Sequence, residues 1–289
     1  TFNRFKKIVP TSNIYIVSNA IYKDMILEQL PEIEDSQVLL EPTRRNTAPC
    51  IAYATARIAS VTDEANIIVA PSDHLILKED DFISTIKEGL DFVAKEDSLL
   101  TLGIKPSRPE TGYGYIQATE GNGNLRKVKT FTEKPNLDLA KVFVDSGEFF
   151  WNSGIFLWNL NTIQNAFKTH LPDVTNKFNK GEKLYGTDKE QEFIDTIYPA
   201  CHNISIDYGI MEKASNVYVL CSEFGWSDLG TWGSLHELSK KDSDNNVSLK
   251  CETLFYESKD NIVALPKNKL AVIQGLEGYI IAETDDVLL

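Results

Sequence analysis

Short apolar runs that alternate with helical patterns constrain the fold of this chain most. Runs of strand length at 38–40, 67–69 and 99–104 are separated by longer stretches with helical spacing at 48–60 and 82–94. A β-α-β-α-β order predicts parallel strands in one sheet, with the helices covering both of its faces. We therefore expect an α/β domain with a mixed, mostly parallel sheet and helices on both faces.

The pattern changes toward the C-terminus. Strand-like runs continue to residue 157, and short β-like runs separated by turns fill the last forty residues. These last runs predict a small C-terminal β segment, which could begin a β-solenoid. The polar stretch 240–246 is the best linker candidate, so we expect domains at 1–240 and 247–289. Both ends fall within expected elements, a helix at 2–9 and a strand at 286–289, so we expect further segments beyond each end.

Charge and composition exclude several classes of function. The 29 basic and 42 acidic residues give a formal net charge of −13, which argues against nucleic acid as a partner. No apolar run approaches the length of a membrane span, and no signal-peptide pattern is visible. The four cysteines lie far apart, as expected for thiols in a reducing cytoplasm.

Two carboxylates stand where a ligand could bind. Asp73 follows the apolar run 67–69, and ligands of open α/β sheets bind beyond the carboxyl ends of strands. Asp228 lies between aromatic residues and glycines in the stretch 225–232. Carboxylate oxygens suit Mg²⁺. The plainer alternatives are a Pro-Ser-Asp turn at Asp73 and an N-cap at Asp228 before a helix at 230–238.

The stretch 41–49 joins a strand to a helix and carries two adjacent arginines, Arg44 and Arg45. Asn46 or Thr47 would cap the helix, and its exposed N–H groups would form an anion site. Glu41 and the exposed amides could also bind the edge of a purine. The alternative is a solvated turn with incidental arginines.

Further polar residues interrupt or end strands in the middle of the chain. Gly114 would let a ligand approach the backbone, and Glu133 and Lys134 would suit a sugar hydroxyl and a phosphate. Asn152 and Gly154 lie within an aromatic strand, and Asp207 begins an expected helix at 207–214. Taken singly, Gly114 is better explained by a β-bulge, and Glu133 with Lys134 by a surface ion pair. Asn152 could instead be paired with the backbone, and Asp207 could be a helix cap. Taken together, they indicate a site for a nucleoside triphosphate, a metal and a phosphorylated sugar.

The ordered motifs resemble the sugar nucleotidyltransferase family. The matching stretches are EPTRRNTAPCIA, APSDH, TGYGYI, FTEKP, WNSGIF, DYGIMEKA and GWSDLGTW, which run in the family's order from residue 41 to 232. The first and the last two of these stretches resemble the branch of the family that joins GTP to mannose 1-phosphate.

This resemblance implies a Rossmann-like nucleotide-diphospho-sugar transferase fold, Mg²⁺, and in-line attack of mannose 1-phosphate on GTP to give GDP-mannose and pyrophosphate. The implied catalytic residues are Asp73, Lys134 and Asp228, with both aspartates as metal ligands. The implied substrate-binding residues are Glu41, Arg45, Asn46, Thr47, Ala48, Pro71, Ser72, Gly114, Glu133, Asn152, Gly154 and Asp207.

The resemblance also leaves alternatives. The family's first strand and glycine-rich phosphate loop would precede Thr1. A catalytically silent, sugar-nucleotide-binding regulatory relative or a nucleotidyltransferase of other sugar or base specificity would share most motifs. A glycosyltransferase Asp-x-Asp motif is discounted, because Asp242-Ser243-Asp244 lies in the polar linker. We also expect a homodimer through the C-terminal β segment.

Overall fold

The computed structural model describes residues 1–120, 123–284 and 286–289, and its contacts divide the chain into two compact units. The large unit comprises residues 1–72 and 76–226, and the small unit comprises residues 73–75 and 227–289. We expected the second domain to begin after a linker at 240–246. By contacts, the chain divides after Trp226 instead, so helix α9 (Trp232–Leu238) belongs to the small unit.

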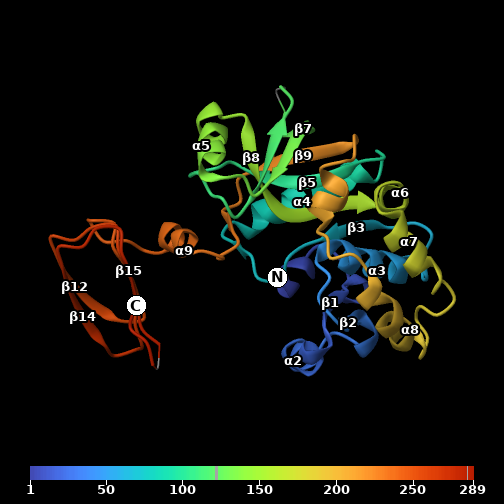
Figure 1. The fold of residues 1–289 in the computed structure, drawn as a ribbon, viewed down its shortest axis with the longest axis horizontal. Helices are drawn as coiled ribbons and strands as arrows, with labels where there is room; N and C mark the ends of the chain where they lie inside the picture. The colour runs from blue at the N-terminus through green and yellow to red at the C-terminus, as the bar shows by residue number, and fades with distance from the viewer. Residues whose placement is uncertain (121–122, 285) are drawn as a thin grey trace. The chain divides into compact units, whose positions relative to one another are not determined.

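The helices of the large unit are mostly those that the apolar spacing predicts (Figure 1). They are α1 (Phe2–Phe5), α2 (Lys23–Gln29), α3 (Thr47–Ala59), α4 (Glu79–Val93), α5 (Leu137–Ser146), α6 (Leu160–His170), α7 (Pro172–Asn179) and α8 (Glu190–Ile197). Short 3₁₀ turns occur at η1 (Thr11–Asn13), η2 (Ala20–Tyr22), η3 (Asp35–Gln37) and η4 (Tyr198–Ala200), and η5 (Asp207–Met211) is a π-helical turn. Helix α7 was not expected, because it buries only Val174 and Phe178.

A six-stranded sheet with the order β3-β8-β5-β9-β7-β6 forms the centre of the large unit. Its strands are β3 (Asn66–Val69), β5 (Leu99–Ile104), β6 (Gly114–Ala118), β7 (Leu125–Glu133), β8 (Phe149–Asn159) and β9 (Val217–Ser222). β1 (Ile16–Asn19) and β2 (Val38–Glu41) form a separate parallel pair. Two short strands, β4 (Leu75–Ile76) and β10 (Trp226–Ser227), pair where the chain passes from one unit to the other.

The expected mixed α/β sheet with helices on both faces is confirmed, but among the described strands most neighbours pair antiparallel, where we had expected a mostly parallel sheet. β3 and β5 run in the same direction without pairing, because β8 lies between them and is antiparallel to both. Of the pairings within the described part of this sheet, β5–β9 is parallel and the rest are antiparallel. Alternating apolar residues predict a strand but do not determine which strand pairs with it.

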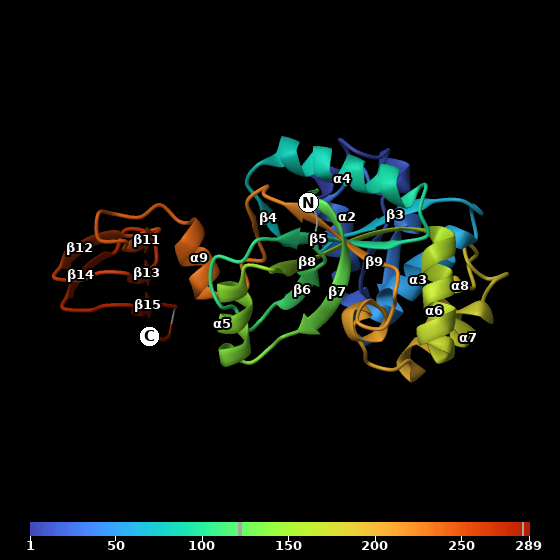
Figure 2. The ribbon, with the colours of Figure 1, turned by 90° about the horizontal axis from the view of Figure 1, so that it is seen from above.

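Both faces of the central sheet are covered, which explains its nearly continuous apolar strands. On β8, Phe156 and Trp158 pack with the core beneath α3, α6 and α7, whereas Ile155 and Leu157 pack with the core beneath α4. Figure 2 shows α4 on one side of the sheet and α3 and α6 on the other. This arrangement leaves the strand ends and their connecting turns to carry polar side chains.

The small unit contains two stacks of parallel strands, as expected for the start of a β-solenoid. β11 (Val247–Leu249), β13 (Ile262–Ala264) and β15 (Ile280–Ala282) form one stack, and β12 (Glu252–Tyr256) and β14 (Leu270–Gln274) form the other (Figure 2). Val263, Leu265, Ala271 and Ile273 fill the interior. None of the helices in the described ranges has both the length and the apolar character needed to span a bilayer.

Candidate functional site

The turn between β2 and α3 has a well-defined backbone. The Asn46 side-chain oxygen accepts a hydrogen bond from the Thr47 N–H at 2.9 Å, which confirms Asn46 as the N-cap of α3. Asn46 has φ = +64°, a conformation that asparagine adopts more readily than most residues. Pro49 lies in the first turn of the helix, where a missing N–H costs nothing. The first amides of α3 therefore face the turn.

Glu41 ends β2 at the start of the same turn. Its Oε1 accepts a hydrogen bond from the Tyr198 hydroxyl, and its carboxylate also interacts with the Cys50 thiol. Burial raises the pKa of Glu41, and these two donors act in the opposite direction by stabilising the carboxylate. The carboxylate is thus held by side chains from η4 and α3.

The segment 198–206 ties down the rest of this turn. The hydrogen bonds that join this segment to the turn include Arg45 Nε and Nη2 to the Pro199 carbonyl oxygen, the Ala48 N–H to the Ile204 carbonyl oxygen at 3.1 Å, and the Ile206 N–H to Thr47 Oγ1 at 2.9 Å. The guanidinium of Arg45, which we expected at an anion site, therefore donates to a backbone carbonyl in this structure.

Asn152 is the centre of a second polar group. Its Nδ2 donates to Asp207 Oδ1 at 2.8 Å, and its Oδ1 accepts from Thr101 Oγ1 at 2.9 Å and from the Gly154 N–H at 3.2 Å. Gly154 has φ = +71°, so a side chain there would strain the backbone. Asp207 does not cap the helical turn that it begins, because its side chain is directed to Asn152.

Glu133 and Lys134 follow β7 and belong to the same group. Lys134 Nζ lies 2.6 Å from Glu133 Oε1, and the two side chains are 58% and 7% exposed. Glu133 Oε2 is buried and has no hydrogen-bond partner among residues 1–120, 123–284 and 286–289. A Cβ atom on Gly114 would lie 2.4 Å from this same oxygen, so a larger residue there would force the Glu133 carboxylate to move. The site thus contains a buried carboxylate oxygen with unused acceptor capacity beside a lysine.

The charges in this second group affect each other. Burial above all, and then the nearby Glu133 carboxylate, raise the pKa of Asp207 to about 6, while the hydrogen bond from Asn152 and the charge of Lys134 act in the opposite direction. The hydrogen bond to Glu133 raises the pKa of Lys134 above its usual value, so Lys134 carries a positive charge at neutral pH. One lysine therefore faces two carboxylates, and a ligand with a hydroxyl group and a phosphate would complement the arrangement.

Asp73 and Asp228 both act on His74 in the small unit. Burial lowers the pKa of His74, and the charges of Asp73 and Asp228 raise it, so both carboxylates lie near one imidazole. The Asp73 side chain is 81% exposed, and its Oδ1 lies 4.0 Å from His74 Nε2. Asp228 accepts the Gly230 N–H at 3.0 Å but is not the N-cap of α9, which is Thr231.

These two aspartates fit an open magnesium site better than a closed one. In the described ranges, no group of three or more His, Cys, Asp or Glu side chains could enclose a metal. Two hard carboxylates leave coordination positions for water and for phosphate oxygens, and Mg²⁺ is commonly bound in this way. The donor set of Asp73 and Asp228 is therefore compatible with Mg²⁺ held jointly with a substrate.

Pro71 and Ser72 lie in the turn that follows β3. The Ser72 carbonyl oxygen accepts a hydrogen bond from the Thr1 hydroxyl at 2.7 Å. Ser72 is exposed and Pro71 is half-buried. Within the described residues, no hydrogen bond joins Pro71 or Ser72 to the groups around Glu41 or Asn152.

The segment 198–207 connects the groups around Glu41 and Asn152, and of its residues we predicted only Asp207 from the sequence. It supplies Tyr198 to Glu41, backbone contacts to the turn, and Asp207 to Asn152. Thr101 was also missed. A fully buried threonine inside an apolar strand was the available signal, because a buried hydroxyl needs a partner.

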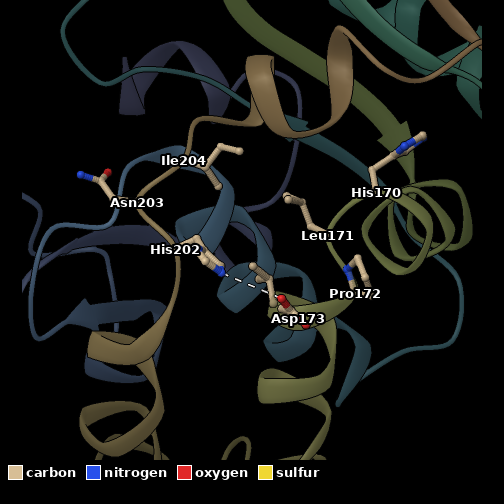
Figure 3. Close-up of a pocket in the computed structure, with 8 residues that line it drawn as sticks. His170, Leu171, Pro172, Asp173, His202, Asn203 and Ile204 are labelled. Carbon is tan, nitrogen blue, oxygen red and sulfur yellow. Dashed lines mark ion pairs between the residues drawn. The ribbon is translucent and has the colours of Figure 1, made fainter.

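Two further polar features are a pocket and the Asp242-Ser243-Asp244 stretch. A pocket of about 250 Å³ is lined by the stretches 170–174 and 202–204, with His202 and Asp173 3.9 Å apart (Figure 3). None of the predicted site residues lines it. In the Asp242-Ser243-Asp244 stretch, Asp242 Oδ1 accepts the N–H groups of Asp244 and Asn246, at 2.9 and 2.8 Å, so this aspartate shapes the turn into the solenoid.

Residues 5–245 match the model of the nucleotidyl transferase family. The chain is 34% identical to a mannose-1-phosphate guanylyltransferase of Escherichia coli over an alignment of 291 positions. This alignment covers 96% of this chain and 62% of that protein. It thus spans about three fifths of the length of this curated relative.

Solved structures agree with this assignment. One from Thermus thermophilus, titled as a mannose-1-phosphate geranyltransferase, superposes with a TM-score of 0.84 at 27% identity, covering all of this chain and 82% of that chain. One from Helicobacter pylori, titled as a mannose-6-phosphate isomerase, gives a TM-score of 0.65 at 29% identity, covering 78% and 88%. From the family match and from these relatives, the chain belongs to the nucleotidyl transferase family.

Proposed function

We propose that this protein transfers GMP from GTP to mannose 1-phosphate, giving GDP-mannose and pyrophosphate. The group of Glu133, Lys134, Asn152 and Asp207 carries the proposal, because it presents a buried, unpaired carboxylate oxygen beside a lysine. The names of the guanylyltransferase relatives support the choice of base and sugar.

The sugar phosphate would bind at this group. Glu133 Oε2 would accept a hydrogen bond from a sugar hydroxyl, since it is buried without a partner. Lys134 would hold the phosphate as a point charge. Asn152 and Asp207 would contact the remaining hydroxyls, while Gly114 and Gly154 would leave room for the ring near the backbone.

The nucleotide would bind at the turn between β2 and α3. We propose that Glu41 accepts hydrogen bonds from the guanine edge and that Asn46, Thr47 and Ala48 line the nucleotide, with the N–H groups of Thr47 and Ala48 already bonded to Asn46 Oδ1 and to the Ile204 carbonyl oxygen. Pro71 and Ser72 would add backbone contacts to the base, and Arg45 would hold the turn in place through the Pro199 carbonyl.

The reaction needs no covalent intermediate on the protein. A phosphate oxygen of mannose 1-phosphate forms a bond to the α-phosphorus of GTP, and the bond to the β,γ-diphosphate breaks, so pyrophosphate leaves. Lys134 would screen the attacking phosphate from the charge of the triphosphate and orient it. Asp73 and Asp228 would hold Mg²⁺, which when bound supplies charge neutralisation at phosphoryl oxygens.

The test is pyrophosphate release by the full-length protein with Mg²⁺ and mannose 1-phosphate, comparing GTP, ATP, dTTP and UTP. We expect release with GTP, and a loss of at least about 100-fold in kcat/KM for Asp73→Asn and for Asp228→Asn, since each removes a charged metal ligand. Asp63→Asn, at an exposed position after α3, is the matched control and should retain activity.

Two other outcomes would replace the proposal. A folded protein that binds GDP-mannose but releases no pyrophosphate with any nucleotide would be a sensing relative. Faster release with another nucleotide and glucose 1-phosphate would indicate a different specificity. We further propose that the protein acts in the cytoplasm, which agrees with the unpaired thiols of Cys50, Cys201, Cys221 and Cys251.

A further inference from the structure

Tyr198 is a fully buried tyrosine whose hydroxyl is bonded to a carboxylate. Its side chain is 0% exposed, and its ring packs edge-on against Phe178 with the ring centroids 6.1 Å apart. The hydroxyl donates to Glu41 Oε1, and the Cys50 thiol also interacts with this carboxylate. The Tyr198 ring is therefore fixed by the core and holds Glu41 from one side.

The position of Tyr198 links the base-binding turn to the rest of the large unit. The next residue, Pro199, accepts the hydrogen bond from Arg45, and the segment continues to the contacts with Thr47 and Ala48. A carboxylate at a strand end has freely rotating side-chain torsions unless such contacts restrict it. The hydroxyl of Tyr198 supplies this restriction to Glu41.

We propose that Tyr198 is a positioning residue that fixes the Glu41 carboxylate for recognition of guanine and thereby sets the preference for GTP. The inference rests on the proposed function, because it concerns the nucleotide that the same site selects. It assigns no direct contact between Tyr198 and the nucleotide.

The chemistry of the bases supports this role. A carboxylate offers about four acceptor positions, and the tyrosine and the thiol use only part of them. The Watson–Crick edge of guanine presents two adjacent donors, N1–H and the 2-amino group, which match a carboxylate. Adenine places the N1 acceptor on that edge, and pyrimidines place carbonyl oxygens there, so a fixed carboxylate would repel them.

The test is steady-state kinetics of Tyr198→Phe in the full-length protein with GTP, ATP and mannose 1-phosphate. We expect the KM for GTP to rise about 10-fold, since a hydrogen bond to a charged group is lost. We expect kcat and the KM for mannose 1-phosphate to change less than about threefold, because the phenol contacts no reacting atom. The GTP-to-ATP ratio of kcat/KM should fall by about the same 10-fold.

Tyr185→Phe is the matched control. Tyr185 belongs to the same core, is 8% exposed, and its hydroxyl donates to the Phe178 carbonyl oxygen at 2.8 Å instead of to a site residue. It should leave the nucleotide preference unchanged. Glu41→Gln should reduce the preference for GTP, and adding Tyr198→Phe to it should cause little further loss, because both act through one carboxylate.

The outcomes separate this inference from the proposed function. If the unaltered protein prefers GTP and Tyr198→Phe retains that preference, or changes KM no more than Tyr185→Phe does, the positioning role is wrong and the proposed function stands. If the unaltered protein releases no pyrophosphate with GTP, the proposed function fails and this inference fails with it.

Discussion

Gly114 occupies a position at which the smallest possible change should disturb the site. A Cβ atom there would lie 2.4 Å from Glu133 Oε2 and 3.3 Å from the Asn152 Cβ atom. Gly114→Ala should displace the Glu133 carboxylate from Lys134 and raise the KM for mannose 1-phosphate by about 10-fold or more, as expected when a positioned polar contact is lost.

The control for this change is Gly123→Ala, because a Cβ atom at Gly123 meets no atom within 4 Å. The KM of this control should match that of the unaltered protein in the same initial-rate assay. Equal KM values for the Gly114 and Gly123 variants would contradict the role given to the Glu133 carboxylate.

Asp207 should make the stability of the protein depend on pH. Its pKa is raised by burial from 3.8 to about 6, so the folded state binds the proton more tightly than the unfolded state. The contribution of Asp207 to the free energy of unfolding is most favourable below pH 3.8. It becomes unfavourable as the pH rises to about 6 and stays unfavourable above that pH. Asp207→Asn keeps an oxygen acceptor for Asn152 and removes the buried charge.

We therefore expect Asp207→Asn to raise the free energy of unfolding at pH 7.5 by about 1–3 kcal/mol, since one pKa unit corresponds to about 1.4 kcal/mol. At pH 4 the two proteins should differ little. Urea unfolding of both proteins without substrate at the two pH values measures this difference. If Asp207→Asn raised the free energy of unfolding by the same amount at pH 4, the effect would not come from the charge of Asp207.

At the scale of elements, buried asparagines hold the turns of the solenoid together. The Asn261 side chain is 0% exposed and joins the Asn246 side chain, the Leu276 carbonyl oxygen and the Tyr279 N–H at 2.9 Å each. Asn261→Ala removes these three hydrogen bonds from the small unit and should destabilise it by about 2–4 kcal/mol.

Hydrogen exchange of residues 247–282, measured in the intact chain, is the suitable readout. Exchange there should accelerate in Asn261→Ala, while the six-stranded sheet keeps its protection. Gln274→Ala removes an exposed amide from β14 and is the control. Unchanged protection in Asn261→Ala would show that the apolar interior alone holds the strands.

The central sheet shows why elements are easier to predict than their pairing. Residues 149–157 were expected as a central strand, and β8 (Phe149–Asn159) occupies that place. Its insertion between β3 and β5 was not predictable, because an apolar pattern on both faces suits either neighbour and either direction. Helix α7 was missed for a related reason, since only two of its residues are buried.

At the scale of the whole molecule, we expect a homodimer through the C-terminal β segment. The outward face of β12 and β14 exposes Leu254, Tyr256, Leu270 and Val272, each by 47% to 61%. Contiguous exposed apolar residues on a soluble chain commonly mark a contact surface. A second copy covering this face would remove them from water.

Light scattering on the full-length protein tests this expectation. Val272→Glu should reduce the measured molar mass from that of two chains to that of one, because dimerisation would bury the new charge in the interface. Val61→Glu is the control, since Val61 and Val272 are both 61% exposed and Val61 lies in the large unit. A mass of one chain for the unaltered protein would exclude the homodimer.

Local physics in the sequence determined the mixed α/β class, most element positions, the cap at Asn46 and the β-solenoid, because periodicity, capping and turn chemistry act over a few neighbouring residues. Only the tertiary structure decided that Asn152 joins Asp207, that Tyr198 holds Glu41, and that Glu133 keeps an unpaired oxygen beside Gly114. These contacts join residues far apart along the chain, and the buried environment that pairs them, or shifts their pKa values, exists only after the strands and helices have packed.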